Sequence, residues 1–247
     1  MIQRTWLGLR FRFVFCSLIF IAIGIACSWL WANGPMVQSL IQGMVPPAKN
    51  HLPADDPLLH RLGQYDFFVQ HIWFEGIATQ VLPFLVVLLS VGGVVSEKKS
   101  GEIAFTLSLP ARRSSWVLTR MAMVLGMTFT LMALSTVALL ATGHWFGYTY
   151  DLEKAVAEST LCGFLGVMWI GLTAFLEMYL IAAMNTFVGV LALQFASFLA
   201  DRWTLWSSLL QIDFWHFGVP WRPLLLMIAV AIGSVFLALQ RFNRMDF

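Results

Sequence analysis

The sequence has few charged residues and few cysteines. Only 11% of its 247 residues are charged, against about 25% in an average soluble domain, and 59% are hydrophobic. This composition excludes an ordinary soluble domain. It predicts an integral membrane protein, because several apolar runs are long enough to cross a bilayer. The three cysteines, Cys16, Cys27 and Cys162, all fall inside apolar runs, so we expect no structural disulfide.

Motifs for nucleotide binding and catalysis are also missing from the sequence. There is no GxxxxGK[ST] phosphate loop, no GxSxG motif, and no HExxH or HxxxH spacing. The basic residues behind the net charge of +2 are spread over several loops and form no patch for nucleic acid. We therefore expect a non-catalytic chain without a metal site or a nucleic-acid partner. The histidines that would have to converge on a metal are His51, His60, His71, His144 and His216.

Long apolar runs dominate what is present, and they predict an all-α membrane protein with one transmembrane domain over residues 1–247. The run 159–200 is split in two, because one helix would be about 63 Å long and a membrane core is ~30 Å thick. We place the turn at residues 184–186. The six predicted spans are residues 13–32, 77–95, 117–142, 159–184, 186–200 and 223–240.

The distribution of basic residues predicts the orientation. Six spans put both termini on one side, and the segments on that side carry ten of the 15 Lys and Arg residues. The positive-inside rule then predicts cytoplasmic termini, an outer loop at 33–76 and a cytoplasmic segment at 96–116. The inner basic residues are Arg4, Arg10, Arg12, Lys98, Lys99, Arg112, Arg113, Arg120, Arg241 and Arg244.

The segment 96–116 is the most densely charged connection between spans, yet it contains a short apolar stretch. Residues 103–109 are too few to cross a membrane. As a helix they would form an apolar stripe that includes Phe105 and Leu109 and stops at Pro110. Such a helix can lie in the groove of a partner protein or on the lipid surface, and the residues alone leave both readings open.

This segment resembles a motif of the membrane subunits of type-2 ABC transporters, the permeases of many bacterial exporters. The resemblance follows the order of a span, Ser96-Glu97-Lys-Lys-Ser-Gly101, an apolar stretch, Leu107-Ser-Leu-Pro110, Ala-Arg112-Arg113 and a new span. The tail 242–246 is similar to the Phe-x-Arg-Arg-Asp ending of that family, and the six-span layout is similar too. The sequence departs from the family pattern at Glu102, where Thr is usual, and at Met245, where Arg is usual.

The resemblance implies a permease in the cell inner membrane that works in export. It implies pairing with a second copy or a related permease, surrounded by lipid, and with two copies of a separate ATP-binding subunit that carries the ATP and Mg. The short helix in 96–116 would then couple the permease to that ATPase. The residues implied in coupling are Glu97, Gly101, Glu102, Phe105, Leu109, Pro110, Arg112 and Arg113.

Four residues in the predicted spans are candidates for lining a pathway. Pro83 kinks a helix by removing a hydrogen bond, and Gln80 lies about one turn earlier. Glu177 and Gln194 are polar groups within later apolar runs. The alternatives are a packing kink at Pro83 and a hydrogen bond from Glu177 to a neighbouring span. An intramembrane carboxylate is costly, so a proton- or ion-coupled carrier that uses Glu177 is the alternative function.

Overall fold

The computed structural model describes residues 2–34, 64–91, 113–180, 185–193 and 221–244. All regular secondary structure in these ranges is helical, as predicted. Residues 185–193 form a further helical stretch. The elements in chain order are α1 (Ile2–Ala32), α4 (Tyr65–Phe68), η2 (Val69–Ala78), α5 (Thr79–Ser90), α8 (Arg113–Trp145), α9 (Leu152–Tyr179) and α13 (Trp221–Asn243).

Within the described residues, five helices are long and apolar enough to cross a membrane. This supports a multi-pass membrane protein. The predicted span 186–200 overlaps the helical stretch 185–193 and then continues outside the described residues. The five helices cover Thr5–Ala32, Tyr65–Ser90, Ser115–Trp145, Leu152–Tyr179 and Leu224–Asn243.

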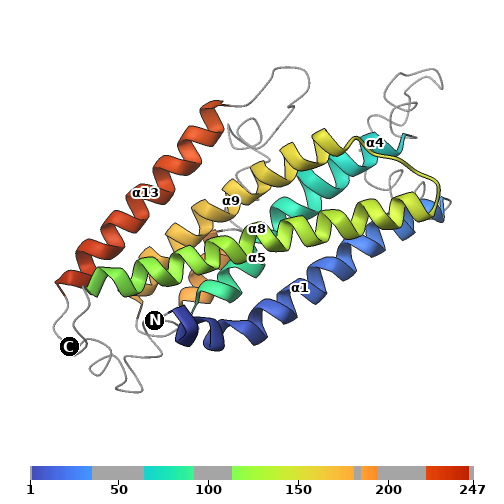
Figure 1. Cartoon of the computed structure of the whole chain (residues 1–247). Coiled ribbons are helices and arrows are strands. Elements are labelled where there is room, and N and C mark those ends of the chain that lie inside the picture. Colours follow the sequence, from blue (N-terminus) through green and yellow to red (C-terminus); the bar gives the residue numbers. More distant parts are fainter. Residues whose placement is uncertain (1, 35–63, 92–112, 181–184, 194–220, 245–247) are drawn as a thin grey trace.

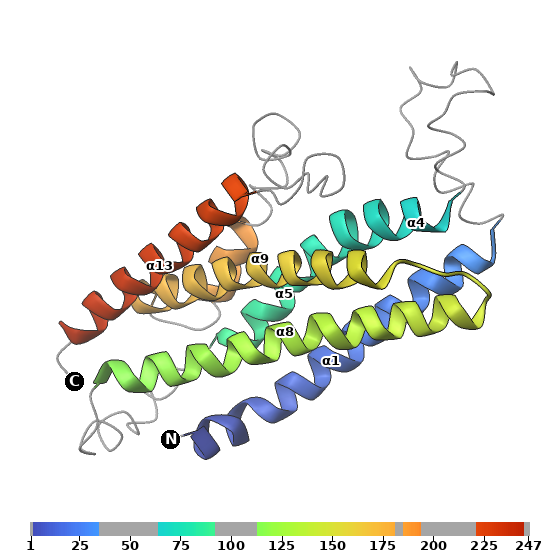
Figure 2. The same cartoon turned by 45° about the horizontal axis from the view of Figure 1, so that its top comes forward.

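The long helices lie side by side, and α13 runs in the same direction as α9, whereas α1, the second span, α8 and α9 alternate in direction (Figures 1 and 2). α8 packs along α1, and α9 packs against α5, α8 and α13. At one end of the bundle α1 and α8 begin, while α5, α9 and α13 end. We call it the arginine end, after Arg12, Arg120 and Arg241. The opposite end is called the tyrosine end, after Tyr65, Tyr148 and Tyr150.

The second span begins earlier than predicted. It starts at Tyr65 and not at residue 77, so residues 65–76 belong to the span and not to the outer loop. Asp66 and Glu75 made this stretch look like a loop. Residues Val69–Ala78 are π-helical, and a π-helix spaces side chains differently from the α-helical period used to read the sequence. The span also stops earlier, because Val91 is extended after Ser90.

The fourth span is displaced toward the N-terminus. It begins at Leu152 instead of 159, where Asp151 caps the helix by accepting a hydrogen bond from the Glu153 amide at 2.9 Å. It ends at Tyr179, and Leu180 is extended. The predicted division of the run 159–200 is therefore present, but the helix stops at residue 179, ahead of the predicted turn at 184–186.

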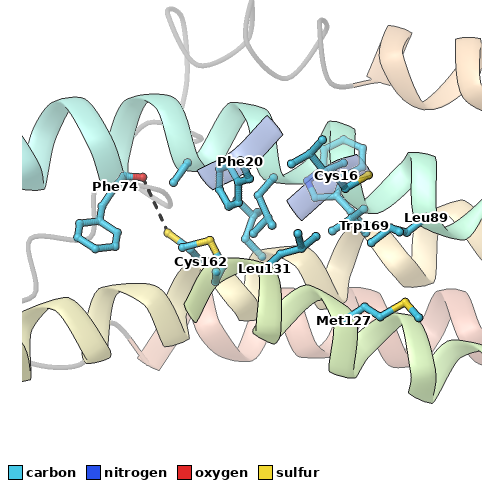
Figure 3. Close-up of a cluster of buried hydrophobic side chains, with 14 of the residues drawn as sticks. Cys16, Phe20, Phe74, Leu89, Met127, Leu131, Cys162 and Trp169 are labelled. Carbon is cyan, nitrogen blue, oxygen red and sulfur yellow. Dashed lines mark hydrogen bonds between the residues drawn. The ribbon is translucent and has the colours of Figure 1, made fainter. Parts of the chain in front are cut away.

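The core is apolar and is shared by all the neighbouring helices. Figure 3 shows side chains from α1, η2, α5, α8 and α9 meeting between the helices, with Phe20, Leu131 and Trp169 among them. Cys162 lies in this cluster, and its thiol contacts the Phe74 carbonyl at 3.9 Å. The three cysteines are buried and free, which agrees with the expected absence of a disulfide.

Two glycines allow backbones to approach closely. A Cβ on Gly24 of α1 would lie 2.9 Å from the Ser135 carbonyl oxygen of α8. A Cβ on Gly171 of α9 would lie 2.9 Å from the Ala231 carbonyl oxygen of α13. In membranes, helix association depends on packing rather than on exclusion of water, so small residues at such contacts matter.

We predict that Gly171→Ala lowers stability. The added methyl group must push against the backbone of α13, and overpacking costs about 1–3 kcal/mol. Gly126→Ala in α8 is the matched control, because its Cβ would meet nothing within 4 Å. Both changes add the same helix propensity, so thermal unfolding in detergent should show a lower midpoint for Gly171→Ala alone. Equal midpoints would contradict the close contact of α9 and α13.

Candidate functional site at the arginine end

Two arginines from different helices cap the end of α5. The last carbonyl groups of a helix have no partner within the helix and need other donors. Arg120 of α8 donates from Nη2 to the Ser90 carbonyl at 3.3 Å. Arg12 of α1 donates from Nη1 to the Leu88 carbonyl at 3.4 Å and to the Val91 carbonyl. These three hydrogen bonds join positively charged guanidinium groups to carbonyl oxygens at the point where the chain leaves α5. They also place positive charge at the negative end of the helix dipole.

Glu177 lies beside this cap. It is in the last turns of α9, only 6% exposed. Its side chain lines a cavity of about 30 Å³ between α5, α8 and α9, together with Ser90 and Arg120. The rest of the wall is apolar and includes Trp116 and Met121. The cavity thus brings an acidic and a basic side chain to the same point at the end of α5.

The beginning of α8 is also held in place. Trp116 of α8 stacks on Phe242 of α13 with a centroid separation of 6.1 Å, and Phe242 is fully buried. Val117, Met178 and Ala238 complete this small cluster. Phe242 opens the tail motif, so that part of the motif serves to pack α13 onto α8.

α13 is tied to α9 at the same end. The Arg241 guanidinium lies over the Tyr179 ring at 5.6 Å from its centroid, a cation–π contact. The end of α5 and the beginning of α8 are therefore both anchored to the surrounding helices. The chain between these two anchored points, residues 92–112, lies outside the described residues.

Most of the predicted coupling residues fall in that part of the chain. Arg113 is placed as the first residue of α8, and nothing is described of its side chain. The residues outside the described ranges are Glu97, Gly101, Glu102, Phe105, Leu109, Pro110 and Arg112.

The predicted pathway residues do not come together. Gln80 is exposed and Pro83 is buried. Glu177 lies near the arginine end, at the level of Ser90, which is well beyond Pro83 in α5. Gln194 is outside the described residues. A pathway role for Gln80 and Pro83 stays a prediction, and the burial of Pro83 is compatible with the alternative of a packing kink.

A second polar cluster at the tyrosine end was missed by sequence reasoning. Ser28 of α1 donates to the Leu139 carbonyl at 2.9 Å, so the Tyr65 hydroxyl donates to Ser28 at 3.1 Å. Tyr65 also stacks on Tyr148 at 5.2 Å. These contacts join the beginning of the second span to α1 and α8. Serine and tyrosine near helix ends are common, so the sequence carried no signal for this pairing.

A buried carboxylate also lies at the tyrosine end. Glu158 of α9 is 2% exposed and accepts a hydrogen bond from the Tyr150 hydroxyl at 3.0 Å. Burial, followed by the charge of Glu158 and the hydrogen bond to it, raises the pKa of Tyr150 above its usual value. Tyr150 therefore stays protonated at neutral pH and remains the donor. The predicted fourth span, 159–184, had left out Glu158.

No protein-family model matches the sequence, and no curated protein is significantly similar to it. The proposed function is therefore based on the residues of this chain.

We predict that removing either capping arginine loosens the end of α5. Arg120→Gln and Arg12→Gln each take a charged donor from the last carbonyls, a loss of about 1 kcal/mol at this partly exposed site. Amide hydrogen exchange in the last turn of α5 should become about fivefold faster. Arg244→Gln removes the same charge from an exposed position at the same end and serves as the control. Unchanged exchange in both arginine variants would contradict the capping role.

We predict that Phe242→Ala destabilises the beginning of α8. The substitution leaves a cavity beside Trp116. The cost in detergent should be about 1–3 kcal/mol, below the value for a soluble core because the released side chain stays in an apolar medium. Phe236→Ala in the same helix is the control, since Phe236 is 64% exposed. Thermal unfolding should separate the two variants, and an equal effect would show that Phe242 has no special place in the packing.

Proposed function

We propose that this chain is the membrane-spanning permease subunit of an ATP-binding-cassette transporter that works in export. Two such permeases, identical or related, would form the translocation pathway in the cell inner membrane. Two copies of a separate ATP-binding subunit, holding ATP and Mg, would contact the segment 96–116. The observation that carries the proposal is that the connection from α5 to α8 starts and ends at points anchored to the rest of the bundle.

Anchored ends are what a coupling segment needs. A push from a partner on residues 92–112 moves the transmembrane helices only if the segment cannot slide or unwind at its two junctions. Arg12 and Arg120 hold the end of α5, and the stack of Trp116 on Phe242 holds the start of α8. Through these contacts a displacement of the segment would reach α1 and α13 as well as α5 and α8.

The charge distribution supports a cytoplasmic location of this end. Arg12, Arg120 and Arg241 gather here, whereas Asp66, Asp151, Glu153 and Glu158 belong to the tyrosine end. Basic residues favour the cytoplasmic side of a membrane. With this orientation, both termini and the segment 96–116 face a cytoplasmic ATPase.

One observation favours a second candidate function. Glu177 is a buried acid in a cavity near one end of the bundle, and buried acids in transmembrane helices often serve in proton or ion relays. A proton- or ion-coupled carrier would transport without any ATPase. Purification of the chain with or without an ATPase therefore distinguishes the two functions.

We predict that affinity purification of this chain from its native host in mild detergent brings down a stoichiometric ABC-type ATPase, identified by mass spectrometry. In the reconstituted complex, Glu97→Lys and Arg112→Glu should uncouple ATP hydrolysis from transport while the helices stay folded. Lys154→Glu reverses a charge at the tyrosine end and should leave coupling intact. A chain that purifies alone and transports under a proton gradient would overturn the proposal in favour of the carrier.

A further inference from the structure

The cavity at the end of α5 is lined by a second charged residue besides Arg120, which caps the helix. Arg120 already donates to the Ser90 carbonyl, and Glu177 of α9 lines the same cavity. Apart from Ser90, the remaining lining residues are apolar, among them Val124, Ile170 and Met178. Arg120 and Glu177 therefore belong to the wall of one mainly apolar cavity.

An attractive electrostatic contact between Arg120 and Glu177 is favoured on physical grounds. A guanidinium group stays charged in proteins, and a charge within an apolar helical bundle is costly unless an opposite charge is near. Among the residues that line the cavity, Glu177 is the acidic one. A volume of about 30 Å³ also leaves room for a water molecule to bridge them. Either contact would restrict the guanidinium to the side of the cavity where the Ser90 carbonyl lies.

We propose that Glu177 is a positioning residue that holds Arg120 on the last turn of α5. The end of α5 would then be set by three helices, with Arg12 from α1, Arg120 from α8 and Glu177 from α9. Because α9 also packs against α13, the position of α5 would depend on the whole bundle. The consequence for coupling, that Glu177 helps to transmit motion from the segment 96–116, rests on the proposed function.

A double-mutant cycle tests the positioning role without any assumption about transport. The four proteins are the unchanged chain, Glu177→Gln, Arg120→Gln and the double variant, and the readout is amide exchange in the last turn of α5. Each single change should accelerate exchange about fivefold. The double change should accelerate it no more than the larger single effect, because the two residues act through one contact.

Two further variants separate a charge effect from a general loss of packing. Glu177→Asp keeps the carboxylate and should retain at least part of the slow exchange. Glu158→Gln removes another buried acid of α9, at the tyrosine end, and should leave the end of α5 unchanged. Single effects that multiply in the double variant, or a Glu177→Gln variant with unchanged exchange, would overturn the proposal.

The functional consequence has its own test. If the chain purifies with an ATPase, Glu177→Gln should raise the ATP hydrolysed per substrate transported at least twofold, and Glu158→Gln should not. An unchanged ratio would overturn the coupling consequence. If no ATPase is found but the cycle still shows one shared contact, the proposed function fails and the positioning role stands.

Discussion

The structure depends on supplying donors to the last carbonyl groups of α5. The last carbonyl groups of a helix have no partner within the helix and need donors from elsewhere. Here the donors come from two other helices, through Arg12 and Arg120. A local requirement of one helix end thus fixes the relative positions of α1, α5 and α8, and it does so where the chain leaves the bundle.

α9 is the helix that joins this end to the rest of the molecule. It contacts α5, α8, η2 and α13, and it carries a buried acid near each end, Glu158 and Glu177. At the tyrosine end, Glu158 accepts from Tyr150 and so holds the α8–α9 connection against α9. Polar groups at both ends specify the depth at which α9 lies, while Gly171 brings it against the backbone of α13. Apolar packing alone would allow α9 to slide along its neighbours.

The sequence predicted the class of fold because hydrophobicity and length decide which segments enter a membrane. It was less accurate at boundaries that polar residues obscure. The predicted second and fourth spans began after Asp66, Glu75 and Glu158, although all three residues lie in helices. The π-helix at Val69–Ala78 was also not predicted, because its side-chain spacing departs from the α-helical period used to read the sequence.

The candidate site could be predicted only in part, for a similar reason. Basic residues near span ends, Arg120 among them, were expected on the inner side. Its actual acceptor is a backbone carbonyl thirty residues away, and a backbone carbonyl leaves no trace in a sequence. Phe242 was noticed as part of a tail motif, but its contact with Trp116 depends on how α13 packs onto α8. Sequence patterns therefore identified which residues belong to this end, and tertiary packing determined their partners.

Caps built from separate helices have a mechanical consequence that a cap within one helix lacks. If the donors to α5 came from its own following residues, the end of α5 could move without affecting its neighbours. Because Arg12 and Arg120 belong to α1 and α8, the end of α5 can move independently only by breaking charge-assisted hydrogen bonds. The lower-energy motion is a concerted one, in which α1, α5 and α8 shift together. A connection between α5 and α8 is then well placed to act on all three helices at once.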